Sequence, residues 1–238
     1  MFLAILRKLT FCVGFTVFLS SLAIAPVSAE EQSSRGEFPG RRVGGGTRSG
    51  RTPNECLANS NALVALSPVD NLGITASNTP SLYFVLPDLT TNYDVNFVLE
   101  DASSVERPNP VVYETRLETQ NTVRFLAIHL PENTLIEDKA YRWYFTLACE
   151  PYDVVLSGWL RQVAADNLTV DLTLDTLNAR LTQVDAYLAS GLWSDAIAAI
   201  VELHQDYPND PEAHAKWIAL LDQLELRSFI KPTTATER

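Results

Sequence analysis

Apolar and polar residues alternate repeatedly between residues 62 and 163, and no other pattern in the chain limits its fold as strongly. Successive side chains of a β-strand point to opposite faces, so this period of two indicates strands with one buried face. Turn-forming residues separate the apolar runs, and no helical pattern lies between them. The strand candidates are 62–66, 81–86, 93–99, 111–117, 123–130, 141–149 and 154–163. Short strands at this spacing predict an antiparallel β-sandwich rather than a parallel α/β sheet.

The candidate strand 141–149 indicates which of its faces is buried. One face carries Tyr, Trp, Phe, Leu and Cys, and is the expected core face, whereas the other carries Arg, Tyr, Thr and Ala. Leu135 stands six residues before Tyr141, an arrangement that resembles the tyrosine corner of immunoglobulin-like and fibronectin-type sandwiches. The resemblance implies a structural rather than a catalytic role for Tyr141, and Trp143 is expected in the core.

Helical spacing replaces the period of two near residue 174. Residues 168–174 still alternate, which fits either a last strand or the start of a helix. Helices are expected at about 174–188, at about 193–205, and after Asp210, with Pro211 at the first helical position. Gly191 is expected to end the first of these helices.

The first two helices resemble a tetratricopeptide repeat, which is a hairpin of two packed helices. The matching residues are Tyr187, Gly191, Trp193, Ala196, Ile200 and Pro208. In that motif Gly191 allows the tight turn and Ala196 lets the helices approach closely. Repeat arrays need about three units to be stable alone, so one hairpin plus one helix is expected to pack on the sandwich. Gly191 and Trp193 are thus structural residues, and a peptide-binding groove is not expected.

The first 29 residues have the features of a cleavable secretory signal. Arg7 and Lys8 precede an apolar stretch that ends in small residues at Ala29. The expected product is exported, periplasmic or extracellular, without a stable membrane anchor; retention of the segment as an anchor is the alternative. Removal of the signal leaves Cys56 and Cys149. In an oxidising compartment they are expected to form a disulfide, and two unpaired buried thiols are the alternative.

The body of the chain is acidic, but the part that follows the signal is basic. The net charge is −11, and loss of two positive charges, Arg7 and Lys8, with the signal leaves −13. Such a surface repels nucleic acid, so nucleic-acid binding is not expected. Residues 30–55 are rich in Gly and Arg and are expected to form a flexible arm. The favoured interpretation is a solvated linker partly pinned by Cys56, and the alternative is a basic segment that docks on the acidic body or on an external polyanion. The candidate residues for binding an anion or a partner are Arg41, Arg42, Arg48 and Arg51.

No pattern of catalytic or metal-binding residues stands out in the sequence. His129 alternates within a candidate strand, and His204 and His214 flank a turn without a common ligand spacing. The motifs of serine and cysteine nucleophiles and of zinc proteases are absent. Neither a metal ion nor a cofactor is therefore expected.

Together, these segments resemble the mostly cyanobacterial secreted proteins of domain of unknown function 928. The resemblance is carried by residues 40–48 ahead of Cys56, 62–68, 141–143 with Cys149, 158–161 and 191–196. It implies a compartment and a bacterial source, but no activity, because none is established for the family. The expected organisation is a signal at 1–29, the arm at 30–55, the sandwich at 56–174, a helical region at 175–230 and a disordered tail at 231–238.

Two functions from different classes agree with these features. The favoured one is a non-enzymatic envelope or secreted module that contacts an anionic polysaccharide or another envelope protein. The alternative is a hydrolase or lyase that acts on an envelope carbohydrate or peptide. That alternative requires a deep pocket with two acids, or His129 beside an acid.

Overall fold

The structure is a computed structural model that describes residues 38–44, 55–57, 62–120, 124–164 and 176–230. All of these residues belong to one compact unit, Ser34–Arg238. The predicted signal, most of the predicted arm, the alternating segment 168–174 and the predicted tail lie outside the described residues.

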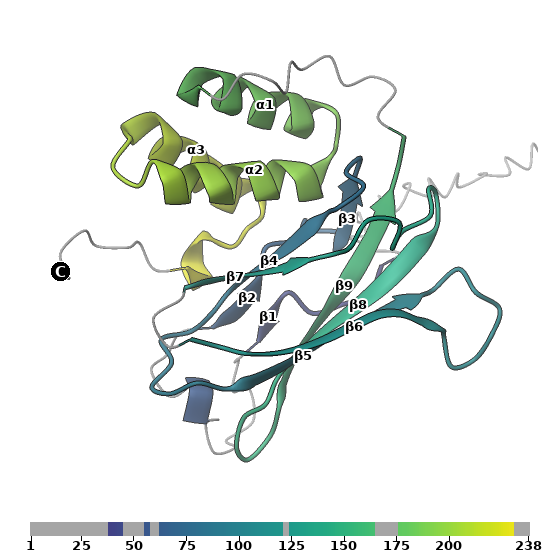
Figure 1. Cartoon of the computed structure of the whole chain (residues 1–238). Helices are drawn as coiled ribbons and strands as arrows, with labels where there is room; N and C mark the ends of the chain where they lie inside the picture. Colours follow the sequence, from purple (N-terminus) through teal and green to yellow (C-terminus); the bar gives the residue numbers. More distant parts are fainter. Residues whose placement is uncertain (1–37, 45–54, 58–61, 121–123, 165–175, 231–238) are drawn as a thin grey trace, which may run out of the picture. The chain divides into compact units, whose positions relative to one another are not determined.

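Two β-sheets form a sandwich, as the alternating pattern predicts (Figure 1). The five-stranded sheet has the order β3 (Leu72–Thr75), β9 (Val154–Gln162), β8 (Ala140–Leu147), β5 (Asp94–Asp101) and β6 (Val111–Glu118). The four-stranded sheet has the order β1 (Val43–Gly44), β2 (Leu63–Ala65), β4 (Ser81–Val85) and β7 (Phe125–His129). Each strand region that the alternation predicts holds one of these strands.

Two strands and one pairing differ from the sequence-based expectation. β3 has four residues and follows a turn directly, and β1 has two residues within the Gly/Arg-rich segment. Both are too short to show an alternating pattern, so they are recognised as strands only through their pairing with β9 and β2. The β3–β9 pair is parallel, whereas the sequence predicted an entirely antiparallel sandwich.

The apolar faces of the two sheets meet in the sandwich core. Alternate residues of β8 between Tyr141 and Leu147 are buried, which confirms the predicted core face. Phe84 of β4 stacks on Phe145 from the opposite sheet, with ring centroids 4.1 Å apart. Gly158 of β9 lies so close to the core that a Cβ atom there would be 2.3 Å from the Trp143 ring. Glycine is therefore required at this point of the strand.

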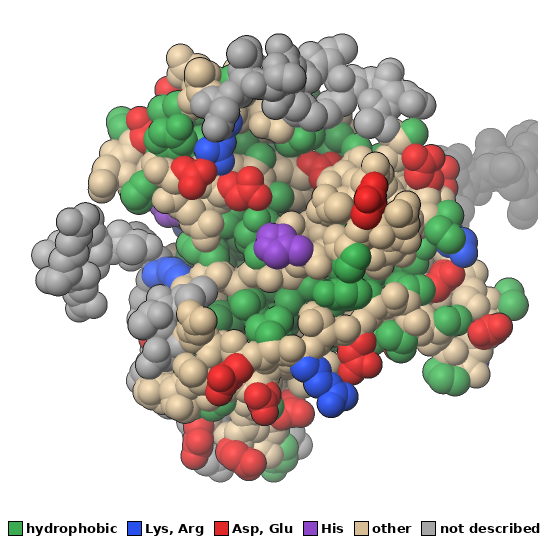
Figure 2. Space-filling view, viewed as in Figure 1, with side chains coloured by type: hydrophobic (Ala, Val, Ile, Leu, Met, Phe, Trp, Pro, Cys, Tyr) green, Lys and Arg blue, Asp and Glu red, His purple; other side chains and the backbone are tan. Residues whose placement is uncertain are grey.

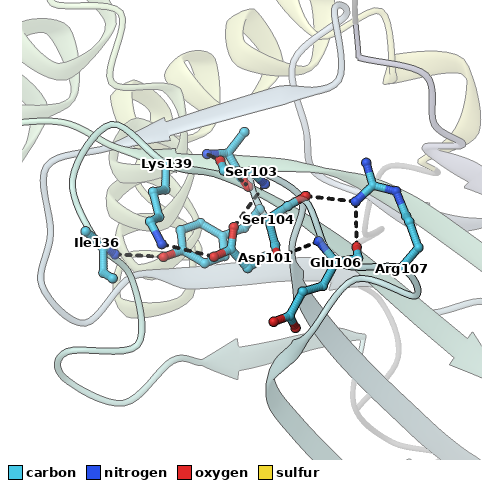
Figure 3. Close-up of polar contacts among 9 residues, drawn as sticks. Asp101, Ser103, Ser104, Glu106, Arg107, Ile136 and Lys139 are labelled. Atoms are coloured by element: carbon cyan, nitrogen blue, oxygen red, sulfur yellow. Dashed lines mark hydrogen bonds and ion pairs between the residues drawn. The ribbon is translucent and has the colours of Figure 1, made fainter.

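The predicted tyrosine corner and disulfide are both present. The Tyr141 hydroxyl accepts a hydrogen bond from the backbone N–H of Ile136 at 2.9 Å, a contact that can be followed in Figure 3. The disulfide joins Cys56 to Cys149, and both cysteines belong to the sandwich core. These contacts tie the loop before β8 and the segment after it to the same core.

Three helices cover the other face of the four-stranded sheet (Figure 1). They are α1 (Leu177–Ala189), α2 (Trp193–Asp206) and α3 (Pro211–Gln223). A second apolar cluster joins them to the sheet, in which Val64 and Val85 belong with Ile197 and Trp217. Because β2 has apolar neighbours on both sides, each of its residues is buried. The four-stranded sheet is thus the middle layer of three, and the predicted packing of the helices on the sandwich is confirmed.

The helix ends follow local signals in the sequence. The Asp210 carboxylate caps α3 by accepting hydrogen bonds from the backbone N–H groups of Glu212 and Ala213, each at 2.9 Å. Gly191 has a φ of 71° in the turn between α1 and α2, a value that favours glycine. The resemblance of this helical pair to a tetratricopeptide repeat stays a prediction. Among the described residues, no helix has both the length and the apolar character needed to span a bilayer.

Candidate binding site

Residues 38–44 of the predicted arm lie against the sandwich. The backbone N–H of Arg41 donates to the Ser157 carbonyl at 2.8 Å, and the Ser157 N–H donates to the Arg41 carbonyl at 3.0 Å. The following residues, Val43–Gly44, pair with β2. This part of the arm therefore connects β9 of one sheet with β2 of the other. The expectation of a flexible arm does not hold here, because the backbone groups find partners on both sheets.

Arg42, a predicted anion-binding residue, is bonded to the protein itself. Its Nη1 donates to the Ser67 carbonyl at 3.0 Å and to the Leu224 carbonyl at 2.8 Å. Burial lowers the pKa of Arg42, although Glu225 and Asp70 oppose this shift. We therefore assign Arg42 to the junction between the sandwich and the end of α3.

The other predicted arginines of the arm differ in how far the structure describes them. Arg41 is exposed, and its Nε donates to the Val43 carbonyl at 3.2 Å. Arg48 and Arg51 lie outside the described residues. Of the four predicted residues, the structure therefore describes Arg41 and Arg42, whose side chains donate to different parts of the chain.

The outer face of the five-stranded sheet carries arginine and aromatic side chains. Arg142 and Tyr144 alternate with the buried residues of β8, so they lie on the face opposite the core. The register places Trp159 of β9 beside Arg142, and Arg161 follows two residues later on the same face. Phe38 packs against Trp159 with ring centroids 5.3 Å apart. We call these five residues the aromatic–arginine face.

Each guanidinium group of the aromatic–arginine face lies over an aromatic ring. The guanidinium carbon of Arg142 is 5.0 Å from the centre of the Tyr144 ring and 5.7 Å from that of Trp159. The guanidinium carbon of Arg161 is 5.8 Å from the centre of the Phe38 ring. At these distances the rings attract the cations. The aromatic side chains therefore help to position both arginines.

The two arginine side chains of this face form no ion pair with a described residue. The Nε atoms of Arg142 and Arg161 are buried and have no hydrogen-bond partner, so contact with a ligand falls to the terminal nitrogens of each guanidinium group. The Trp159 indole N–H, by contrast, donates to the Pro39 carbonyl at 3.0 Å, which fixes the ring. A guanidinium group matches the geometry of a carboxylate or phosphate and can bind it through two hydrogen bonds. The arrangement therefore suits an anionic ligand.

A hollow of about 550 Å³ opens beside strands β5, β6 and β8 of the same sheet. The strand register pairs Asn96 with both Arg116 and Thr146, which places the three side chains on one face of the sheet. Arg116 forms an exposed ion pair with Glu114 at 3.3 Å. The full lining consists of Asp94, Val95, Asn96, Arg116, Leu117, Thr146, Ala148 and Asp153. The hollow supplies mixed hydrogen-bonding groups rather than one dominant charge.

A second polar cavity, of about 190 Å³, lies between α1, α2 and the start of β4. We call it the helix groove, and its lining consists of Ser77, Thr79, Pro80, Ser81, Arg180, Gln183, Tyr187, Asp195, Ala198, Ala199 and Glu202. Tyr83, next to this lining, donates its hydroxyl to Glu202 at 3.1 Å. Burial raises the pKa of Tyr83, and the Glu202 carboxylate raises it further.

Asp195 is the buried acid of the helix groove. Its carboxylate accepts hydrogen bonds from the Thr75 hydroxyl at 2.6 Å and from the Ala76 N–H at 2.7 Å. Burial nevertheless raises the pKa of Asp195, because the loss of water outweighs these hydrogen bonds. The residue joins the beginning of α2 to the end of β3.

His129 lies apart from His204 and His214, which are neighbours. The Ser81 hydroxyl forms a hydrogen bond with Nδ1 of His129 at 2.8 Å, across the β4–β7 pair. His204 stacks on Trp217 with ring centroids 5.4 Å apart. The ring centroids of His204 and His214 are 6.0 Å apart. Within the described part of the chain, no group of three or more His, Cys, Asp or Glu residues is arranged to hold a metal ion.

Sequence reasoning missed the aromatic–arginine face, although its signal was present. The non-core face of β8 was correctly expected to carry Arg142 and Tyr144, and Trp159 and Arg161 occur two residues apart in β9. Strand alternation shows that such residues share a face within one strand. It does not show that β8 and β9 pair in the register that places Arg142 beside Trp159.

Comparisons with known proteins identify a family and distant structural likenesses. The family model described as Domain of Unknown Function (DUF928) matches residues 43–233. No curated protein matches. Among solved structures, the crystal structure of calcium binding domain CBD12 of CALX1.1 has a TM-score of 0.24 and 10% sequence identity, and the match covers 38% of this chain and 40% of that chain. The match thus spans less than half of that protein.

Proposed function

We propose that this chain, which belongs to the DUF928 family, is an exported, non-enzymatic module that binds an anionic polysaccharide. The aromatic–arginine face is the proposed contact surface. The observation that carries the proposal is the pair of arginines, Arg142 and Arg161, which lie over aromatic rings and have no acidic partner among the described residues.

Aromatic rings and guanidinium groups supply the two contacts that an acidic sugar chain needs. The flat faces of Trp159 and Tyr144 offer apolar surface to the C–H groups of a sugar ring. Arg142 and Arg161 offer paired N–H donors to carboxylate groups along the polymer. Sugar hydroxyls can bond to the polar side chains of the adjoining hollow, including Asn96 and Thr146.

Charge also favours a local site for the polymer. The chain carries a net charge of −11, and acidic side chains lie on both the helices and the strands in Figure 2. An anionic polymer is repelled by most of such a surface, so binding requires a place where cations lack acidic partners. Arg142 and Arg161 form no ion pair with a described residue, and Glu100 of β5, which the register places beside Arg142, is an acidic neighbour on this face.

The export that we propose rests on the signal-like segment 1–29 and on the disulfide. A disulfide between Cys56 and Cys149 is typical of proteins in an oxidising compartment. A polysaccharide of the cell envelope is available in the same compartment.

Retention on immobilised polysaccharide tests the proposal. We expect the purified protein to bind polygalacturonate, which carries carboxylates, and to pass through neutral dextran. Replacing both arginines, as Arg142→Gln with Arg161→Gln, is expected to weaken binding to polygalacturonate at least tenfold. Added salt is expected to weaken binding of the unchanged protein, because the contacts are ionic.

The matched control changes the same number of charges elsewhere. Arg227 and Lys216 form exposed ion pairs on the helix layer, with Asp222 and Asp185 respectively. The double variant Arg227→Gln with Lys216→Gln should bind polygalacturonate as the unchanged protein does. Equal loss in both double variants, or binding only to a protein of the envelope, would contradict the proposed ligand.

The alternative of a hydrolase or lyase requires two acids in a pocket. The hollow is lined by Asp94 and Asp153, and the helix groove is lined by Asp195 and Glu202. There Asp195 accepts two hydrogen bonds from Thr75 and Ala76, and Glu202 accepts one from Tyr83. Carboxylates held by protein donors in this way favour binding and structural roles over proton transfer to a substrate. We therefore prefer the binding module.

A further inference from the structure

We propose that the helix groove binds a small ligand through a primary ammonium group. This site is separate from the aromatic–arginine face, and the two surfaces share no lining residue. The inference therefore does not rest on the proposed polysaccharide function.

The groove exists because small side chains stand where larger apolar ones would fill the space. Ala198 and Ala199 line it on α2, between the buried residues Ile197 and Ile200. Packed protein interiors leave few voids larger than a water molecule. A volume of about 190 Å³ instead holds several water molecules or one small ligand.

The walls of the groove are polar although the groove adjoins the apolar cluster beneath the helices. Gln183 and Tyr187 contribute from α1, and Asp195 and Glu202 contribute from α2. Asp195 is buried, Gln183 and Tyr187 are half-buried, and Glu202 is exposed, so the groove is accessible to a ligand from solution.

The field inside the groove is negative. Asp195 and Glu202 both raise the pKa of the Tyr187 phenol, in addition to the larger effect of burial. The cation of the lining, Arg180, forms an ion pair with Asp206 at 2.7 Å and lies over the ring of Tyr207. Asp206, which is not part of the groove lining, is thus one acidic partner of this cation. A cationic ligand is attracted to such a site, and an anion is repelled.

The hydrogen-bonding groups favour an ammonium ion among cations. An ammonium group has three donors and no acceptor. Tyr83 donates to Oε1 of Glu202 at 3.1 Å, and no described residue donates to Oε2. The Tyr187 hydroxyl accepts from Gln183 at 3.0 Å, and its ring supplies a face for a cation. An alkyl chain of a few carbons can then lie along Ala198 and Ala199.

Three probes of equal chain length test the charge preference: butylammonium, 1-butanol and butyrate. Titration of the purified full chain at pH 7, followed by NMR chemical shifts, gives their affinities. We expect butylammonium to bind at least tenfold more tightly than 1-butanol, and butyrate to bind most weakly. Equal affinities for butylammonium and 1-butanol would overturn the proposal.

Two variants locate the site. Glu202→Gln should weaken butylammonium binding about tenfold and leave 1-butanol binding unchanged. Ala199→Leu fills the groove without altering its charge, so it should abolish binding of both, and it decides the matter if Glu202→Gln does not fold. Glu132→Gln, which alters an exposed acid in another loop, should leave all affinities unchanged. Unaltered butylammonium binding in folded Glu202→Gln or Ala199→Leu would refute the assignment.

Discussion

At the scale of single residues, the arginine side chains of this protein differ in the groups that their guanidinium groups contact. Arg42 ends at two backbone carbonyls, whereas Arg142 and Arg161 lie over aromatic rings. All three are arginines near apolar surface, so residue type alone does not separate a structural role from a binding role. The partner of each guanidinium group does separate them.

Replacement of Arg42 tests its structural role. Arg42→Gln removes the charged donors from the Ser67 and Leu224 carbonyls, and we expect the free energy of unfolding to fall by about 1.5–3 kcal/mol. Urea unfolding followed by circular dichroism measures the change. Arg41→Gln is the control: Arg41 is exposed, so its replacement should change stability by less than about 0.5 kcal/mol. Equal effects of the two variants would contradict the assignment.

His204 gives the stability a dependence on pH. Burial lowers its pKa, and the neighbouring His214 and Arg124 lower it further. Below the ordinary value of about 6.5, the unfolded state binds a proton that folded His204 does not take up. The free energy of unfolding should therefore fall as the pH decreases from 6.5 towards the lowered pKa, and this contribution is constant above 6.5.

Unfolding experiments at pH 7.5 and pH 5.5 measure this contribution. The loss of stability between the two values should be smaller in His204→Gln than in the unchanged protein. His129→Gln serves as the control, because His129 lies on a different part of the fold. A pH dependence that His204→Gln leaves unaltered would assign the effect to other groups.

At the scale of elements, the four-stranded sheet holds the protein together because each of its faces packs against a different apolar cluster. One of its faces belongs to the sandwich core, and the other belongs to the cluster beneath the helices. The alternation in β4 allows both, because Phe84 contributes to the first cluster and Tyr83 to the second. The amphipathic helices cover the second face, since their buried residues recur at helical spacing.

The hydrogen bonds of Asp195 fasten the helix layer to the five-stranded sheet as well. In Asp195→Asn, an amide NH2 must face the donors of Thr75 or Ala76, so we expect a loss of about 1–3 kcal/mol in the free energy of unfolding. Hydrogen exchange should become faster in the first turn of α2. Asp185→Asn, which alters an exposed ion pair with Lys216, should leave both measurements nearly unchanged. Unchanged exchange in Asp195→Asn would contradict this role.

At the scale of the whole molecule, long-range links hold together segments that are distant in the chain. The disulfide joins residues separated by 93 positions, and Arg42 reaches a carbonyl 182 positions away. Such links close large loops, so they restrict the unfolded chain strongly. Part of the stability of the fold therefore comes from outside its helices and strands.

Removal of the disulfide should cost about 4–5 kcal/mol in the free energy of unfolding, according to loop-closure entropy. The double variant Cys56→Ser with Cys149→Ser tests this value by urea unfolding. The unchanged protein in reductant should behave like the double variant, and reductant should not affect the double variant. A double variant as stable as the oxidised protein would show that the link contributes little.

Much of the secondary structure follows from the sequence because its signals are local. Alternation predicted every strand of the sandwich except β1 and β3. Helical spacing, together with Asp210, Pro211 and Gly191, predicted where the helices begin and end. β1 and β3 escaped because two and four residues carry too little periodicity. The disulfide was predictable because only Cys56 and Cys149 follow the signal-like segment.

The surfaces that could bind a ligand depended on tertiary structure. Periodicity indicates that one side of a strand is apolar, but it does not say which element covers that side. Arg42 was expected to be available to an anion, and packing between β2 and α3 instead gave it protein partners. The aromatic–arginine face required the register of β8 and β9, and the helix groove required three elements to meet. Such contacts join residues far apart in the chain, so only the packing of the layers decides them.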